Sequence, residues 1–208
     1  MTAPGGTIFI VDDDASIRGA LSRALTLRGF AVQTFESAEE FLANYAPEDA
    51  GCLVLDYGMP RVSGLDLQDR LNEIGYRIPI IFISGHGGVP ETVRAMRSGA
   101  VDFLEKPFRQ EVLIERIQAA LEIDATTRRD DTQHAEARRR LANLTEREAE
   151  IAKLIVSHPS EASSKFIARM LDISPRTVDH HRARILEKMV VKSVAELVDL
   201  NNKAGLFD

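Results

Sequence analysis

Short apolar runs of buried-strand length alternate with helical patterns through the first half of the chain. The runs are rich in β-branched residues and fall at 7–11, 31–35, 51–55, 79–83 and 101–104. Between them, apolar residues recur at helical spacing, as at Ile17, Leu21 and Leu25. Five strands that alternate with helices predict an α/β domain in which a five-stranded, doubly wound parallel sheet is covered by helices on both faces. The run at 31–35 alternates in polarity, which suits an edge strand.

The composition narrows the class of protein and its compartment. The 208 residues are 44% hydrophobic and 28% charged, which is ordinary for globular domains and argues against global disorder. A single cysteine, Cys52, excludes an intramolecular disulfide framework and a cysteine-based zinc site. The N-terminus lacks the pattern of a signal peptide, and no long uncharged apolar run suggests a membrane span. We therefore expect a cytoplasmic protein without membrane contact.

The chain is long enough for a second, smaller domain. We expect the first domain at 1–123, a charged connector at 124–140 that is either a solvated helix or a flexible linker, and a second domain at 141–208. Thr145 and Glu148 form a capping-box pattern that predicts a helix start. Ser174 and Pro175 predict another start, with Ser174 as the N-cap. Four short helices with a tight connection between the second and third predict an all-α helix-turn-helix module.

The distribution of charge separates the two domains. The formal net charge is −6, but residues 1–123 carry −7 and residues 165–192 carry +4. A total of −6 therefore does not exclude nucleic acid as a partner, because the basic excess is confined to the proposed helix-turn-helix.

Polar side chains follow four of the predicted strands. Asp12, Asp13 and Asp14 follow the first strand and Asp56 follows the third, so parallel strands would bring these carboxylates to one edge of the sheet. Clustered carboxylates repel one another unless a cation neutralises them. Because their oxygens are hard donors, Mg²⁺ is a suitable cation. Any one of these aspartates alone is more often a solvated loop or capping residue.

Two further residues complete this edge. Ser84 follows the fourth strand and Lys106 follows the fifth. A hydroxyl donor and an ammonium that face an anion site are what a transferred phosphoryl group needs. The four strand ends together therefore predict a carboxylate site that accepts a phosphoryl group.

The motifs VDDD, LDYGMPRVSG, ISGHG and EKPF closely resemble those of a two-component response regulator receiver domain, which has a flavodoxin-like fold. The resemblance implies that Asp56 accepts phosphate from a sensor histidine kinase. It also implies that Mg²⁺ is held by four groups: the carboxylates of Asp12, Asp13 and Asp56 and the Gly58 carbonyl. Ser84 and Lys106 are then expected to contact the phosphoryl oxygens. Phe103 is implied to be the aromatic switch residue. The bond between Lys106 and Pro107 is expected to be cis.

The segment GHGGVPETVRAMRSGAVDFLEKPF is most similar to the FixJ branch of that family. Its glycines, Gly85, Gly87 and Gly88, suit a loop that rearranges on phosphorylation, although an ordinary glycine-rich turn has the same composition. His86 has no partner that would suggest a catalytic or metal-binding role.

The last 65 or so residues resemble the LuxR-type DNA-binding domain in LTEREAEI, KFIARMLDISPRTVDHHRARILEKMVVKS and AELVDL. Val178, His181, Ile185 and Met189 would form the inner stripe of the recognition helix, so His181 is interpreted as a packed residue. The predicted DNA-binding residues on this helix are Arg176, Thr177, Asp179, His180, Ala183, Arg184 and Lys188.

Two departures from the family pattern stand out. The connection 157–164 is about three residues longer than is usual, and Val194 stands where an arginine is common. The final helix, 193–203, suits either a dimer surface or the domain core.

These features favour a transcriptional regulator that is switched by phosphorylation, with promoter DNA as its target, a homodimer as its phosphorylated form and RNA polymerase as a further candidate partner. Two alternatives compete with it: a magnesium-dependent phosphohydrolase with Asp56 as nucleophile, and a binding protein of the same architecture that ignores phosphorylation. The phosphohydrolase would need a general acid near the nucleophile, which Gly58 does not supply. The protein is therefore expected not to be an enzyme beyond slow self-phosphorylation and self-dephosphorylation.

Overall fold

The structure is a computed structural model that describes residues 5–85 and 88–207. Two residues discussed above lie outside the described residues. They are His86, to which the sequence assigned no catalytic or metal-binding role, and Gly87, one of the glycines of the loop that is expected to rearrange. Contacts divide the chain into two compact units, Met1–Arg128 and Arg129–Asp208. Each unit is described by itself.

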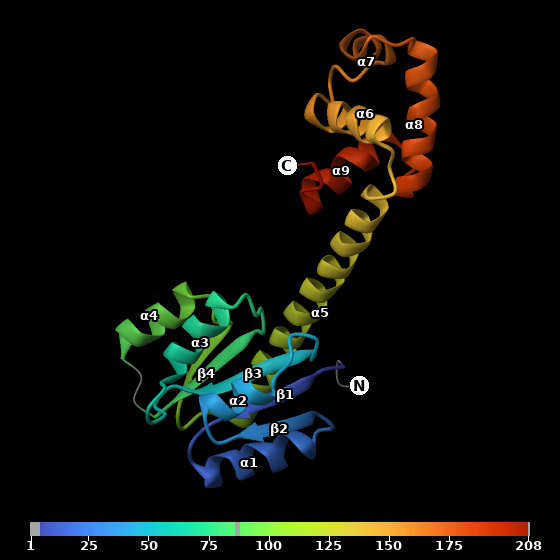
Figure 1. Cartoon of the computed structure of the whole chain (residues 1–208). Helices are drawn as coiled ribbons and strands as arrows, with labels where there is room; N and C mark the ends of the chain where they lie inside the picture. The colour runs from blue at the N-terminus through green and yellow to red at the C-terminus, as the bar shows by residue number, and fades with distance from the viewer. Residues whose placement is uncertain (1–4, 86–87, 208) are drawn as a thin grey trace. The chain divides into compact units, whose positions relative to one another are not determined.

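The first unit alternates strands and helices (Figure 1). Its elements are β1 (Thr7–Val11), α1 (Ala15–Thr26), β2 (Ala31–Phe35), α2 (Ala38–Asn44), β3 (Gly51–Asp56), α3 (Gly64–Glu73), β4 (Ile80–Ser84), α4 (Val89–Arg97), β5 (Asp102–Glu105) and the first part of α5 (Gln110–Leu141). The strands form one parallel sheet in the order β2-β1-β3-β4-β5. This confirms the predicted doubly wound α/β fold, with β2 at an edge.

Alternate residues of each strand face two separate hydrophobic layers. Phe9 and Val11 of β1 pack in the layer that contains residues of α2 and α3, while Ile8 and Ile10 pack in the layer that contains Leu25 of α1 and residues of α5. Because the side-chain period of a strand is two, a sheet covered on both faces needs apolar residues at every position. All six residues of β3 are buried for this reason.

Parallel pairing brings the carboxyl ends of the central strands to one edge. Asp56 of β3 pairs with Ile83 of β4, and Ser84 of β4 pairs with Glu105 of β5. The residues that follow each strand therefore share this edge, as the sequence predicts.

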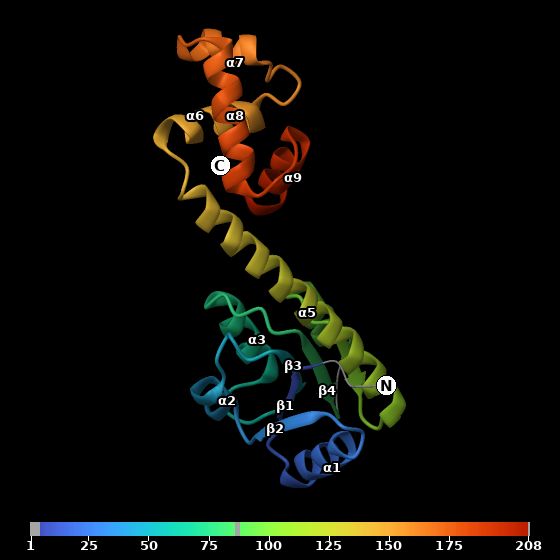
Figure 2. The same cartoon turned by 90° about the vertical axis from the view of Figure 1, so that its right-hand side faces the viewer.

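The second unit contains helices α6 (Glu146–Ser157), α7 (Ser164–Leu171), α8 (Pro175–Met189) and α9 (Val194–Ala204), seen from the side in Figure 2. The predicted capping box of Thr145 and Glu148 is present at α6. The N-cap of α8 is Ser174, whose side chain accepts from the Thr177 N–H. Ile151, Ile167 and Val178 belong to one core that draws on α6 to α9.

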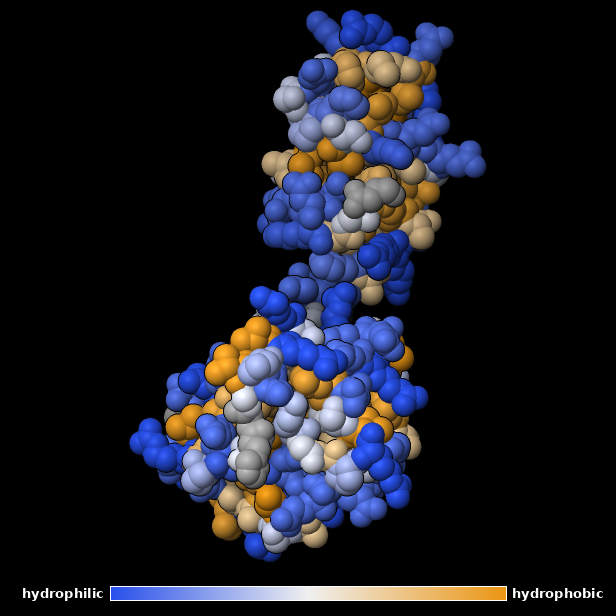
Figure 3. All heavy atoms as spheres, turned by 90° about the vertical axis from the view of Figure 1, so that its left-hand side faces the viewer, coloured by the Kyte–Doolittle hydropathy of each residue, from blue (hydrophilic) through white to orange (hydrophobic). Residues whose placement is uncertain are grey.

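Helices α7 and α8 form the helix-turn-helix. Asp172 ends α7 with a left-handed φ of 51°, and Pro175 begins α8. Val178, Ile185 and Met189 of the predicted inner stripe are fully buried, and His181 is half-buried. On the face drawn in Figure 3, hydrophilic side chains predominate in both units and hydrophobic ones gather in separate patches. None of the helices within residues 5–85 and 88–207 is long and apolar enough to cross a membrane.

Candidate functional site

Three polar side chains are buried at the carboxyl edge of the sheet. Asp12, directly after β1, is 1% exposed; Asp56, the last residue of β3, is 7% exposed; and Ser84, the last residue of β4, is 2% exposed. Buried carboxylates are costly unless a cation or hydrogen-bond donors compensate them.

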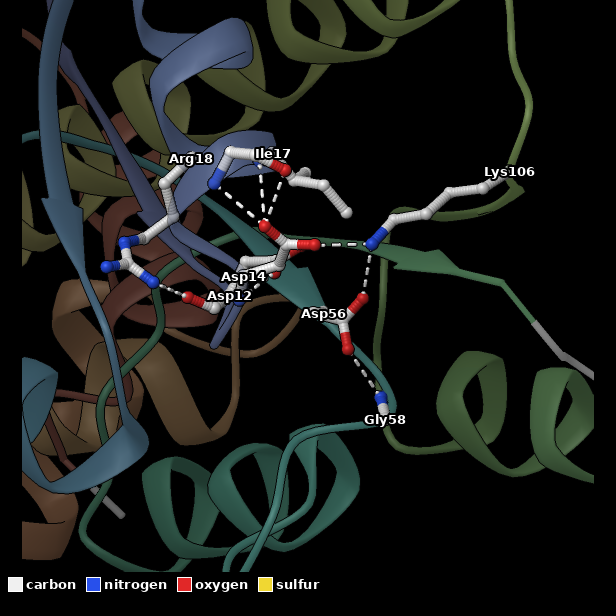
Figure 4. A network of polar contacts seen from close by, with 8 residues as sticks. Asp12, Asp14, Ile17, Arg18, Asp56, Gly58 and Lys106 are labelled. Atoms are coloured by element: carbon white, nitrogen blue, oxygen red, sulfur yellow. Dashed lines mark hydrogen bonds and ion pairs between the residues drawn. The ribbon is translucent and has the colours of Figure 1, made fainter.

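Lys106 supplies that compensation. Its Nζ lies 2.6 Å from Asp56 Oδ1 and 2.9 Å from Asp12 Oδ2, so one ammonium bridges both carboxylates (Figure 4). The backbone positions it, because the Lys106 N–H donates to the Ser84 carbonyl at 2.7 Å. The expected cis bond between Lys106 and Pro107 is present.

The electrostatics of this cluster follow from burial and pairing. Burial raises the pKa of Asp12 above its ordinary value of 3.8, and the nearby Asp56 charge adds to this, although hydrogen bonds from Lys106 and the Asp14 N–H oppose it. For Lys106, burial lowers the pKa, but hydrogen bonds to Asp56 and Asp12 outweigh it, and the net shift is upward. The lysine therefore stays protonated as a counter-ion at neutral pH.

Backbone donors hold the two carboxylates in place. The Gly58 N–H donates to Asp56 Oδ2 at 2.7 Å, and the Asp14 N–H donates to Asp12 Oδ1 at 2.8 Å. Arg18 of α1 donates to the Asp12 carbonyl at 2.6 Å (Figure 4). Sequence reasoning missed Arg18, whose only sequence signal is its position on the first helical turns after the aspartates.

The other two acidic residues after β1 have different surroundings. Asp14 is the N-cap of α1 and accepts from the Ser16 and Ile17 N–H groups. Asp13 is exposed and lines a shallow surface pocket together with Met59 and Arg61. In the part of the chain that the structure describes, no three acidic, histidine or cysteine side chains converge closely enough to enclose a metal ion.

Phe103 of β5 packs in an aromatic group next to the acceptor strand. Its ring stacks on Phe82 with centroids 6.0 Å apart, and it meets Tyr57 edge-on at 6.2 Å. Tyr57 directly follows Asp56 in the sequence, so Phe103 contacts the residue next to the predicted acceptor. The sequence reading did not single out Tyr57.

The outward face of α8 carries most of the residues predicted to contact DNA. Six of them are exposed: Arg176, Thr177, Asp179, His180, Ala183 and Arg184.

Thr177, Asp179 and Lys188, which are among the seven predicted DNA-contact residues, also make polar contacts within the unit. The Thr177 and Ser174 hydroxyls lie 2.7 Å apart, and Asp179 Oδ1 accepts from the Ser164 hydroxyl. Lys188 Nζ lies 2.5 Å from Oε2 of buried Glu148 and donates to the Asn143 carbonyl. The ammonium of Lys188 is thus engaged in contacts within the second unit, with Glu148 and Asn143.

The fold, the buried cluster and the helix-turn-helix together define a protein that receives a signal in one domain and binds DNA with the other. The chain belongs to the two-component response regulators: residues 8–118 match the response regulator receiver domain family, and residues 142–201 match the bacterial regulatory proteins of the luxR family. It is a transcriptional regulator rather than a catalytic enzyme, so the phosphohydrolase alternative is set aside.

Relatives match along nearly the whole chain. It is 45% identical to the transcriptional regulatory protein FixJ of Rhizobium meliloti strain 1021 over 200 residues, with 96% of each chain covered. It is 40% identical to the response regulator protein TodT of Pseudomonas putida over 203 residues, which cover 98% of this chain and 88% of TodT. Among solved structures, the response regulator StyR is 41% identical, with a TM-score of 0.80 and coverage of 95% and 98% of the two chains.

Proposed function

We propose that Asp56 receives a phosphoryl group from a sensor histidine kinase and that this modification promotes dimerisation and binding to promoter DNA. The observation that carries the proposal is the bridge from Lys106 to Asp56 and Asp12. A buried carboxylate next to a fixed ammonium is suited to become an acyl phosphate, since phosphoryl transfer depends mainly on positioning and charge neutralisation.

The residues of the cluster have separate roles in this transfer. An oxygen of the Asp56 carboxylate bonds to phosphorus while the bond from phosphorus to the donor's leaving atom breaks. Lys106 and Ser84 contact the phosphoryl oxygens. The Gly58 N–H, which holds Asp56 Oδ2, orients the carboxylate so that Oδ1 faces Lys106.

The donor set fits Mg²⁺. Asp12 and Asp56 supply two buried carboxylates, and Mg²⁺ in proteins is usually held by one or two carboxylates together with waters and phosphate. Asp13 and the Gly58 carbonyl are the remaining proposed ligands. When bound, Mg²⁺ would neutralise charge on the carboxylates and on the incoming phosphoryl oxygens.

The residues around Asp56 connect the proposed phosphorylation site to β5. Lys106 links Asp56 to the end of β5, and Phe103 lies in that strand. We propose that Phe103 and Ser84 shift when Asp56 is phosphorylated, that this changes the surface of α4 and β5, and that the changed surface promotes pairing of two receivers. Linking two DNA-binding units then raises affinity through effective concentration.

We assign DNA recognition to residues 141–208, with residues 1–123 as receiver and residues 124–140 as connector. The exposed face of α8 would enter the major groove, and a twofold dimer expects a roughly palindromic site. The basic excess of residues 165–192 supports contact with phosphates.

Intact mass after incubation with a small-molecule phosphoryl donor and Mg²⁺ tests the acceptor. The wild-type chain is expected to gain one phosphoryl group, and Asp56→Asn none. Glu73→Gln, which changes an exposed carboxylate of α3 in the same unit, is the matched control and should match wild type. Equal phosphorylation of Asp56→Asn and wild type would refute Asp56 as the acceptor.

A further inference from the structure

Asp179 is an acidic residue on the exposed face of the helix that would meet DNA. It lies on the second turn of α8, and its side chain is exposed. A carboxylate at this place repels phosphates, but it can accept a hydrogen bond from a base. Such a contact requires the carboxylate to be held in one orientation.

Ser164, the first residue of α7, provides that restraint. Its hydroxyl donates to Asp179 Oδ1. Arg182 Nη1 in turn donates to Ser164 Oγ at 3.2 Å, so the hydroxyl accepts from the arginine and its one proton is directed to Asp179. Within the described residues, Asp179 Oδ2 receives no hydrogen bond, so this oxygen of an exposed side chain is available as an acceptor.

The connection between α6 and α7 anchors this chain of hydrogen bonds. Arg182 Nη2 donates to the carbonyl of Ala162, and Ala162 is buried in the core of the second unit. Ser163 is the N-cap of α7 and accepts from the Phe166 N–H. The two adjacent serines therefore differ in role, because Ser163 caps the helix and Ser164 holds Asp179.

We infer that Ser164 is a specificity-determining positioning residue: it holds Asp179 so that the free carboxylate oxygen accepts a hydrogen bond from the N4 amino group of a cytosine in the major groove. The inference rests on the proposed function, in which α8 reads DNA. A carboxylate accepts from cytosine N4, whereas guanine O6 and N7 and thymine O4 are all acceptors. Adenine also offers a donor, N6, but its neighbouring N7 is an acceptor that repels a carboxylate, so cytosine is the favoured partner. The predicted readout is a cytosine at one position of each half-site.

Base selection tests this assignment. Randomised duplex DNA is bound by the phosphorylated full-length chain as wild type, Asp179→Ala, Ser164→Ala, Ser164→Thr, Ser160→Ala and Arg184→Ala, and the bound fraction is sequenced. Ser160 is an exposed serine of the same connection and serves as the matched control. Thermal unfolding of each variant reports whether the second unit remains folded.

Wild type and Ser160→Ala are expected to prefer cytosine at one position of each half-site. Asp179→Ala should reduce that preference about tenfold, the size of one lost base contact. Ser164→Ala should reduce the preference at the same position by several-fold while the salt dependence of binding stays unchanged, and Ser164→Thr, which keeps the hydroxyl, should restore it. A merely structural role for Ser164 would instead weaken binding to all sequences equally.

The results for Ser164→Ala test the inference, and the results for wild type and Arg184→Ala test the proposed function on which it rests. Ser164→Ala with an unaltered base preference refutes the positioning role, as does a uniform loss of affinity across all sequences. If wild type selects no sequence and Arg184→Ala binds as wild type does, then DNA recognition by α8 fails and the inference fails with it. Loss of binding in Arg184→Ala with unaltered selection in Ser164→Ala refutes the inference alone.

Discussion

Lys106 and Asp56 form the central ion pair of the receiver, with Nζ 2.6 Å from Oδ1. The lysine is 22% exposed at its side chain and the aspartate 9%, so the pair is only partly shielded from water. The same ammonium also contacts Asp12, and one cation therefore compensates two carboxylates. We therefore expect the stability of the unit to depend on which cation compensates the two carboxylates.

Lys106→Met is expected to destabilise the first unit in metal-free buffer. The substitution leaves two neighbouring carboxylates without their counter-ion, at a cost of about 1–3 kcal/mol, less than for a fully buried pair. Because Mg²⁺ would take over the role of the ammonium, adding it should restore most of the loss. Urea unfolding with EDTA and with Mg²⁺ measures both effects. A variant whose stability does not respond to Mg²⁺ would contradict the assignment of Asp12 and Asp56 as metal ligands.

The thiol of Cys52 is expected to be inert in the folded protein. Cys52 lies within β3 with no exposed surface, and burial raises its pKa to about 12. The thiolate, which is the reactive form, is therefore absent at neutral pH. A chromogenic disulfide reagent should react only as denaturant unfolds the first unit, and the signal is unambiguous because the chain has one cysteine. Rapid reaction in native buffer would show that β3 opens readily.

The second unit should lose stability in acid through Glu148. Burial raises the pKa of this carboxyl, but hydrogen bonds from Lys188 and from Thr145 outweigh it and hold the pKa below its ordinary value of 4.5. A carboxyl with a lowered folded pKa stabilises the fold above its unfolded pKa, and this stabilisation is lost as pH falls through the folded value. Unfolding of the second unit should therefore become easier below about pH 4.5.

Glu148→Gln checks this dependence. It is expected to lower the free energy of unfolding by about 1–3 kcal/mol at pH 7, since Lys188 loses its charged partner, and to flatten the acid dependence. Glu146→Gln, an exposed residue of the same helix turn, is the control and should keep the wild-type profile. The same acid slope in Glu148→Gln and wild type would show that another group is responsible.

A clamp within the first unit holds the start of β3. Asp124 of α5 is buried and accepts from the Gly51 N–H at 3.0 Å, and Arg128 Nε lies 2.9 Å from Asp124 Oδ2. The Arg128 guanidinium also donates to the carbonyls of residues 47–49. We expect Asp124→Ala to destabilise the unit by about 2–3 kcal/mol, because the Gly51 N–H is left buried without an acceptor.

Calorimetric or urea unfolding of Asp124→Ala, Arg128→Ala and the double variant measures the coupling, expected at about 1 kcal/mol or more. Arg129→Ala, the exposed next residue, should change stability by less than about 0.5 kcal/mol. Additive losses in the double variant would show that the two side chains act independently.

Local patterns predicted the fold and the order of the site residues well. The apolar runs predicted all five strands: β1, β3 and β4 are buried on two faces, and β2 has the alternating polarity of an edge strand. Thr145, Glu148 and Ser174 predicted helix starts because capping depends only on neighbours in sequence. Lys106 could be placed with Asp56 because strand ends of a parallel sheet share an edge.

Contacts between distant segments were not predictable in the same way. Arg18 and Arg128 bind backbone carbonyls, which carry no sequence signal. Lys188 reads as a surface cation on a basic helix, yet its long side chain reaches Glu148, 40 residues earlier. Ser164 looked like part of an overlong turn, and its contact with Asp179 depends on how α7 packs against α8.

The affinity of the full-length chain for its selected operator, measured by fluorescence anisotropy with and without a phosphoryl donor and Mg²⁺, tests the central claim most directly. We expect phosphorylation to raise the affinity of wild type and of Glu73→Gln at least tenfold, through pairing of the DNA-binding units, and to leave Asp56→Asn unchanged. Equal affinity of wild type in both conditions, or an equal gain in Asp56→Asn, would contradict control of DNA binding by phosphorylation of Asp56.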